Sequence, residues 1–232
     1  GEIGDLMRIE IKMILRNKRP KTMLYVSIVF LAYGFIFYAK ENLDNYLMNT
    51  FAGLILTSIF AMNYGQFIFS WESSFFDSYI TNKISPYSYI KSKYLFFTIS
   101  CLLSFIITLP YALISYKIGF INSALLLYNI GISSIVLILF GTYNSNRIDL
   151  GRSQFMNYQG TGFTQFLIII PILALPALIY LIFSFFDVPQ YSFYTLGILG
   201  VIGIAFNKYL LQMATNQFIK RKYKMAFGFR QK

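Results

Sequence analysis

Long uncharged stretches alternate with short charged ones along the whole chain. Six stretches of at least 18 residues contain no Asp, Glu, Lys or Arg. A helix of about 20 residues crosses a hydrocarbon core of about 30 Å. The period-2 alternation that is typical of membrane β-barrels does not occur. We therefore predict an all-α membrane protein, a six-transmembrane-helix bundle with spans at about 22–39, 50–70, 94–116, 123–141, 165–186 and 191–211.

The segment before the first span has a helical pattern. In residues 3–16 four charged side chains share one sector of an ideal helix, namely Asp5, Arg8, Lys12 and Arg16. Such a pattern is typical of an interfacial amphipathic helix, and with the basic turn after it this unit spans 1–21. Glu10 falls in the apolar sector, where a carboxylate needs a partner. It either pairs with a nearby Lys or Arg or contacts another subunit.

A polar interval at 72–93 separates the second predicted span from the third. On an ideal helix one side of this interval is mostly apolar and consists of Phe75, Phe76, Tyr79, Ile80 and Lys83. Ser85 followed by Pro86 is typical of a helix cap and a first helical position. The pattern predicts a short amphipathic helix along the membrane surface, a turn and a re-entry into the membrane. This arrangement would give a soluble partner a handle.

The charges indicate a topology. Hydrophobic residues make up 56% of the chain and charged ones 12%, against about 25% charged in soluble domains. Of the 20 Lys and Arg, all but Lys40 and Lys117 fall in segments on one side of the predicted bundle. The positive-inside rule then predicts both termini in the cytoplasm. The net charge of +11 is explained by topology and anionic lipid headgroups, with 212–232 as a basic cytoplasmic tail, and not by nucleic acid.

Several kinds of chemistry are excluded by residue type. The chain has no His and one Cys, Cys101, so it lacks His-based triads, Cys/His zinc sites and internal disulfides. No GxxxxGK[ST] phosphate loop occurs, and no pair of acids lies at membrane depth. We expect no catalytic residue, no metal and no cofactor bound by this chain.

Polar residues elsewhere leave alternatives open. Asn63 and Gln66 lie in the second predicted span, where they either join helices or line a pathway. Arg147, Asp149 and Arg152 lie in the inner loop before the fifth span and either contact a partner or form local ion pairs. Glycines recur every three residues in the sixth span and favour close helix contact, at Gly197, Gly200 and Gly203.

The motif in the 72–93 interval resembles that of a known family. Glu72, then Ser85-Pro86, then Lys91 and Lys93 are similar to the acidic residue, Ser/Thr-Pro turn and closing lysine in the permease subunits of ABC-2 type transporters. Those subunits have an inner amphipathic helix, six spans and a coupling helix between spans two and three. Ser73 and Ser74 depart from the basic residue and glycine that commonly follow the acid. Residues 15–20, LRNKRP, also resemble a poorly characterised permease-like family, which implies that this chain is the second half of a longer protein.

The resemblance implies a function and partners. The chain would be the permease subunit of an ABC-2-like exporter in the bacterial inner membrane, driven by a separate cytoplasmic ATPase that uses ATP. A second six-span unit, either a homodimer partner or the other half of a longer chain, would complete the pathway. The docking surface for the ATPase would consist of Glu72, Phe75, Phe76, Asp77, Tyr79 and Ile80. The alternative is a non-transporting membrane scaffold or assembly subunit.

Overall fold

The structure is a computed structural model that describes residues 1–82, 84–151 and 163–231. Within these ranges all regular structure is helical and no strand occurs. The α-helices are α1 (Glu2–Arg16), α2 (Lys18–Ala32), α3 (Gly34–Phe37), α4 (Tyr46–Leu56), α5 (Ile59–Gly65), α6 (Phe76–Thr81), α7 (Pro86–Thr108), α8 (Tyr116–Tyr128), α9 (Ser134–Gly141), α10 (Phe163–Phe185), α11 (Tyr191–Ala205) and α12 (Asn207–Arg230). The shorter elements are η1 (Lys40–Asn42), η2 (Ser70–Glu72), η3 (Leu109–Leu113) and η4 (Asn129–Ser133), of which η4 is a π-helical turn.

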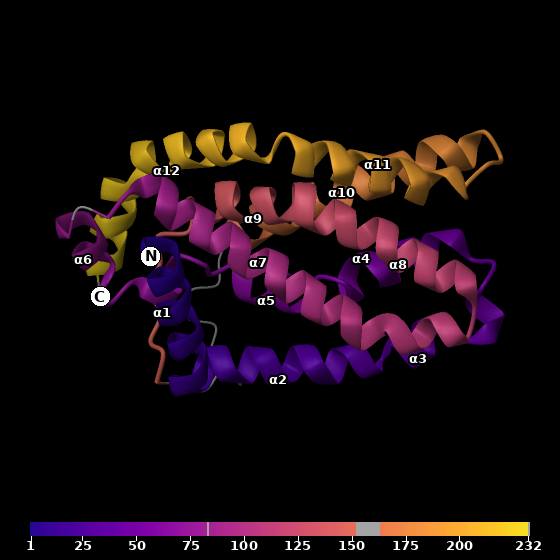
Figure 1. The fold of residues 1–232 in the computed structure, drawn as a ribbon, viewed down its shortest axis with the longest axis horizontal. Coiled ribbons are helices and arrows are strands. Elements are labelled where there is room, and N and C mark those ends of the chain that lie inside the picture. The colour runs from indigo at the N-terminus through magenta and orange to yellow at the C-terminus, as the bar shows by residue number, and fades with distance from the viewer. Residues whose placement is uncertain (83, 152–162, 232) are drawn as a thin grey trace.

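The long helices run along one axis of an elongated bundle (Figure 1). Helices α1 and α6 and both chain termini lie at one end, which we call the termini end. Helices α2 and α12 lie along opposite edges in this view, with α7 crossing between them. The largest apolar cluster lies where residues of α1, α5, α7, α9 and α12 meet.

Among the described residues, four helical stretches are long and apolar enough to cross a membrane, at Lys18–Phe37, Pro86–Leu113, Tyr116–Gly141 and Leu167–Phe185. Two bent pairs, α4 with α5 and α11 with α12, raise this number to six if each pair is one span. The described helices are thus compatible with a multi-pass membrane protein. The all-helical class is confirmed, whereas the six-span bundle stays a prediction, because the described helices supply four to six candidate spans.

The second predicted span is bent by 61° between α4 and α5. Two hydroxyls at the bend donate to carbonyls four residues earlier, Thr57 to Gly53 at 2.7 Å and Ser58 to Leu54 at 2.7 Å. Hydroxyls bonded in this way often bend helices. The side-chain amide of Asn129 in η4 stabilises the bend, because it donates hydrogen bonds to the Leu54 carbonyl oxygen and to the Thr57 hydroxyl.

The sixth predicted span also differs from the expected form. Helix α11 ends at Ala205, and the chain turns by 73° into α12, which continues to Arg230. The predicted boundary near 211 thus falls within α12, and the assignment of 212–232 as a basic cytoplasmic tail stays a prediction. Helix α12 packs against the body along a stripe of seven buried residues, Leu211, Ala214, Thr215, Phe218, Met225, Ala226 and Phe229.

The glycines of α11 make the close contact that their spacing predicts. A Cβ atom on Gly200 would lie 2.3 Å from the backbone of Leu127 and Tyr128 in α8, and one on Gly203 would lie 2.6 Å from the Gly131 carbonyl oxygen in η4. Backbone atoms at such distances cannot move aside as a flexible side chain can. Helix α11 is therefore held against α8 and η4 at a separation that excludes any side chain at these positions.

We predict that Gly200→Ala destabilises the protein, because the added methyl group would force α11 away from α8. Overpacking of this kind typically costs about 1–3 kcal/mol and occasionally more. Thermal unfolding of the purified protein in detergent, followed by circular dichroism, measures the effect. Gly4→Ala is the matched control, since a Cβ atom there meets nothing within 4 Å. Equal melting temperatures for the two variants would contradict the predicted packing.

Candidate functional site

The polar interval at 72–93 forms the structure that its sequence predicts in outline. It contains the end of η2, then the short helix α6 and then the start of α7. Ser85 caps α7 by accepting a hydrogen bond from the Ser88 amide, and Pro86 occupies the first turn. The helix start predicted from Ser85 and Pro86 is therefore confirmed. Helix α6 has six residues, fewer than its apolar pattern suggested.

The apolar side of α6 faces the protein interior. Phe76 is 1% exposed, and its ring contacts those of Phe218 and Phe229 in α12 at centroid distances of 6.1 and 5.1 Å. Tyr79 is buried as well, whereas Phe75 and Ile80 are partly buried against the same cluster.

This burial corrects the proposed docking surface. Phe76, Tyr79 and Glu72 are buried and cannot form an exposed contact for a partner. The rings of α12 cover Phe76, whereas Glu72 is enclosed by its hydrogen-bond partners. Asp77 differs from these three residues, because its side chain is half exposed. Docking on the 72–93 interval itself stays a prediction.

Asp77 fastens α6 to the end of α12. Its two carboxylate oxygens accept hydrogen bonds from the Arg230 guanidinium, both at 2.9 Å. These hydrogen bonds hold the pKa of Asp77 below its usual range. Two parallel bonds of this kind fix orientation as well as distance. Helix α6 is therefore tied to α12 both through Phe76 on its inner side and through Asp77 on its outer side.

A buried ionic cluster lies beneath α6. The Lys93 ammonium group of α7 donates hydrogen bonds to a Glu10 oxygen of α1 and to a Glu72 oxygen of η2. The exposed fractions of these three side chains are at most 3%. We call Glu10, Glu72 and Lys93 the carboxylate–lysine cluster. It joins three segments that are far apart in the sequence.

Three tyrosines complete the hydrogen bonding of the two carboxylates. Tyr64 donates to Glu10 at 2.6 Å, and Tyr79 donates to Glu72 at 3.2 Å. Tyr89 donates to the other oxygen of Glu72. The Trp71 ring stacks on Tyr64, and its N–H group donates to the Tyr64 carbonyl oxygen at 3.0 Å. Each carboxylate oxygen of the cluster thus has a donor, as buried charge requires.

The charges within the cluster do not cancel. Two carboxylates surround one ammonium group, and burial raises the pKa of Glu72 to about 7 even though Lys93 acts in the opposite direction. A carboxyl group with this pKa changes its protonation state near neutral pH.

The sequence marked part of this cluster. The apolar sector of residues 3–16 indicated that Glu10 needs a partner, and the structure shows that this partner is Lys93, 83 residues away. Glu72 and Lys93 were singled out through the family resemblance, without any sign that they meet. The three tyrosines lie among 19 in the chain, and no spacing in the sequence distinguishes them.

Asn63 and Gln66, the polar residues singled out in the second predicted span, make different kinds of contact. The Asn63 amide donates to the Ser27 hydroxyl of α2 at 3.2 Å, which joins two helices. The Gln66 side-chain amide donates to the backbone carbonyl oxygen of Asn63 in its own segment. The backbone carbonyl oxygen of Gln66 accepts a hydrogen bond from the Asn144 side chain. These contacts favour the interhelical alternative for Asn63 over pathway lining.

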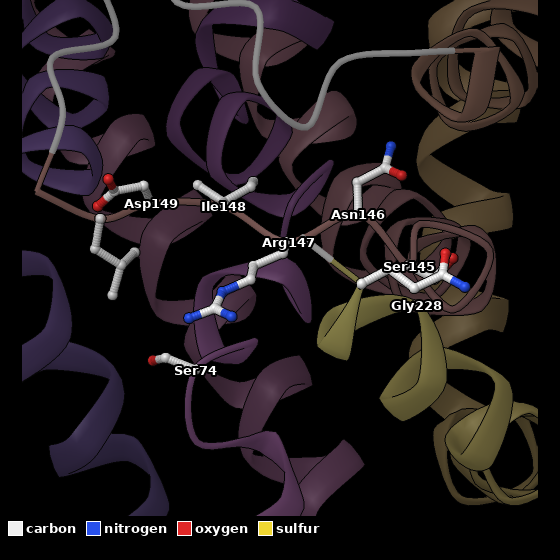
Figure 2. Close-up of a pocket in the computed structure, with 9 residues that line it drawn as sticks. Ser74, Ser145, Asn146, Arg147, Ile148, Asp149 and Gly228 are labelled. Carbon is white, nitrogen blue, oxygen red and sulfur yellow. The ribbon is translucent and has the colours of Figure 1, made fainter.

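The predicted second contact region borders an open pocket of about 840 Å³ at the termini end. The pocket lies between the Ser74 turn, residues 145–150 and the last turn of α12. Figure 2 shows the Arg147 guanidinium reaching toward Ser74, whereas the Asp149 carboxylate points the other way. Arg147 and Asp149 thus lie on one pocket wall beside the α6 segment, and Arg152 lies outside the described residues.

We predict that Lys93→Met lowers the free energy of unfolding by about 3–5 kcal/mol, because it leaves two buried carboxylates without their counter-charge. Lys117→Met is the matched control, since the ammonium group of Lys117 pairs with Asp44 at 3.4 Å in an exposed position. Removal of such an exposed pair costs about 0–1 kcal/mol. Denaturant titrations in detergent micelles measure both, and similar losses would argue against a central role for the cluster.

Comparison with known proteins gives a family but no function. No curated protein and no solved structure matches this chain. A family model described as "Family of unknown function (DUF5687)" matches residues 1–232, which is the whole of the chain. The chain therefore belongs to the DUF5687 family.

Proposed function

We propose that this chain is the transmembrane permease subunit of an ABC-2-like exporter and that a separate cytoplasmic ATPase drives it. The observation that carries the proposal is the position of α6. It is a short helix at the termini end, it lies between a bent apolar pair and the long apolar helix α7, and its inner face is locked to the bundle. A surface helix in this position is suited to receive a push from a soluble partner.

The contacts around α6 give such a push a route into the bundle. Glu72 connects the segment before α6 to Lys93 in α7 and, through Lys93, to Glu10 in α1. A Glu2 oxygen of α1 also accepts a hydrogen bond from the Ser85 amide at 2.9 Å, just before α7. A displacement of α6 would therefore move α1, α7 and α12 together, because packed elements joined by such bonds shift as units.

The outer face of α6 offers a polar surface to the ATPase. The exposed residues of α6 are Ser78 and Thr81, and Ser74 and Asn82 are exposed just before and after it. The pocket beside Arg147 continues this surface toward residues 145–150. The proposed contact thus differs from the apolar surface expected from the sequence. It consists of small polar side chains and one arginine.

The proposal includes a second unit and a location. Most residues of the apolar stretches Lys18–Phe37 and Leu167–Phe185 are not buried within the bundle, so both stretches present wide apolar faces to lipid or to another subunit. Because the bundle is closely packed, the proposed pathway lies between two such units. The second unit is either a homodimer partner or the other half of a longer chain. In this arrangement both termini and α6 lie on the cytoplasmic side of the bacterial inner membrane, as the distribution of Lys and Arg favours.

We predict that Ser78→Arg weakens retention of the ATPase, because a long charged side chain would obstruct the outer face of α6. The measurement is co-purification of this chain with the proposed cytoplasmic ATPase, with the retained ATPase compared with wild type. Glu41→Arg is the control, since Glu41 is exposed in η1 outside the α6 segment. Full retention by Ser78→Arg would remove α6 as the docking helix.

Transport itself distinguishes this proposal from a non-transporting scaffold. Vesicles that contain the chain, its second unit and the ATPase should accumulate or release a solute in an ATP-dependent and directional manner. A scaffold would retain the ATPase in the co-purification but would move no solute.

A further inference from the structure

The carboxylate–lysine cluster carries a net charge of about −1 when all three of its groups are ionised. Glu10 and Glu72 contribute two negative charges when ionised, and Lys93 contributes one positive charge. The three facing phenols, Tyr64, Tyr79 and Tyr89, are neutral donors. An uncompensated charge in a water-excluded interior is costly, and a carboxyl group relieves the cost by taking up a proton.

The other charged groups near the cluster donate no hydrogen bond to Glu10 or Glu72 in the described part of the chain. Arg19 of α2 lies near the rings of Phe67 and Trp71, and it interacts electrostatically with Asp149. Glu2 of α1 bonds the Ser85 amide at the surface. Lys222 of α12 lines a crevice outside the cluster. One proton on a carboxylate is therefore the simplest way to make the cluster neutral.

We propose that the carboxylate–lysine cluster is a proton-binding site in which Glu72 takes up one proton from the surface between α6 and α12. The ligand is a hydrogen ion, and the site consists of Glu72 with Lys93, Glu10 and the phenols of Tyr79 and Tyr89. The inference concerns the chain by itself and does not depend on the proposed transport function.

A crevice gives the proton a route. It has a volume of about 260 Å³ and is lined by Tyr79 and Tyr89 together with Phe218 of α12 and Lys222 at its side. Both tyrosines that form its inner wall donate to Glu72. A hydronium ion in the crevice can give a proton to the Tyr89 oxygen while the Tyr89 O–H proton passes to Glu72. This transfer leaves water, a neutral tyrosine and a neutral carboxylic acid.

The same geometry distinguishes Glu72 from Glu10. The phenol that donates to Glu10 is Tyr64, whose ring packs against Phe60, Phe96 and Trp71. Tyr64 is 0% exposed and is not among the residues that line the crevice. Glu72 is thus the carboxylate connected to the surface through phenols, whereas Glu10 is connected to Lys93 and to the enclosed Tyr64.

Protonation of Glu72 makes the fold depend on pH with a defined sign. The pKa of Glu72 in the fold is raised above its usual value, to about 7. The folded state therefore binds this proton more tightly than the unfolded chain does, so the added stability is complete below about pH 4.5 and is lost as the pH rises through about 7.

Infrared difference spectroscopy on the purified protein in nanodiscs tests the proposal, with spectra compared between about pH 5.5 and pH 8.5. We expect the carbonyl stretch of a protonated carboxylic acid to disappear with a midpoint near pH 7 in wild type. Glu72→Gln should lack this band, and Glu41→Gln, which changes an exposed glutamate, should keep it.

A second variant covers the case in which Glu72→Gln does not fold. Tyr89→Phe removes one hydrogen bond to the ionised carboxylate, so the midpoint should move to higher pH while the band remains. Persistence of the titrating band in Glu72→Gln, its absence from wild type, or an unchanged midpoint in Tyr89→Phe would each overturn the proposal.

Discussion

The ammonium group of Lys93, held between two carboxylates in the interior, is the constraint on which the arrangement of the termini end depends. Burial of ionisable groups is tolerated only when every one of them finds partners. The segments that supply Glu10, Glu72 and Lys93 are therefore fixed to one another, and the tyrosines of α5, α6 and α7 are fixed with them. Helix α6 takes its place on top of this cluster, with α12 closing over its apolar side.

Local signals in the sequence predicted the features that depend on local backbone chemistry. Ser85 and Pro86 start a helix because a hydroxyl and a fixed φ act within one turn, and Gly200 gives close contact because it lacks a side chain. Features that depend on a distant partner escaped prediction. The pattern of α6 indicated an apolar side but not what would cover it, and α12, which contains most of the expected surface tail, packs over Phe76.

The same distinction applies to the candidate site. Glu10 was recognisable because a carboxylate in an apolar sector conflicts with its surroundings at the level of a single helix. Its partner lies two apolar spans later, and no periodicity connects positions that far apart. The bend between α4 and α5 could not be predicted for a similar reason. A Thr-Ser pair alone does not specify a bend, and the Asn129 amide that bonds Leu54 and Thr57 comes from η4.

The separation of Glu10 from Lys93 also bears on how the chain is assembled. During synthesis Glu10 emerges 83 residues before the group that neutralises it. Until α7 has been made, α1 carries a carboxylate whose final location is not yet available, so it must wait at the water-facing surface. Helix α1 can therefore complete its buried polar contacts only after the start of α7 has been made.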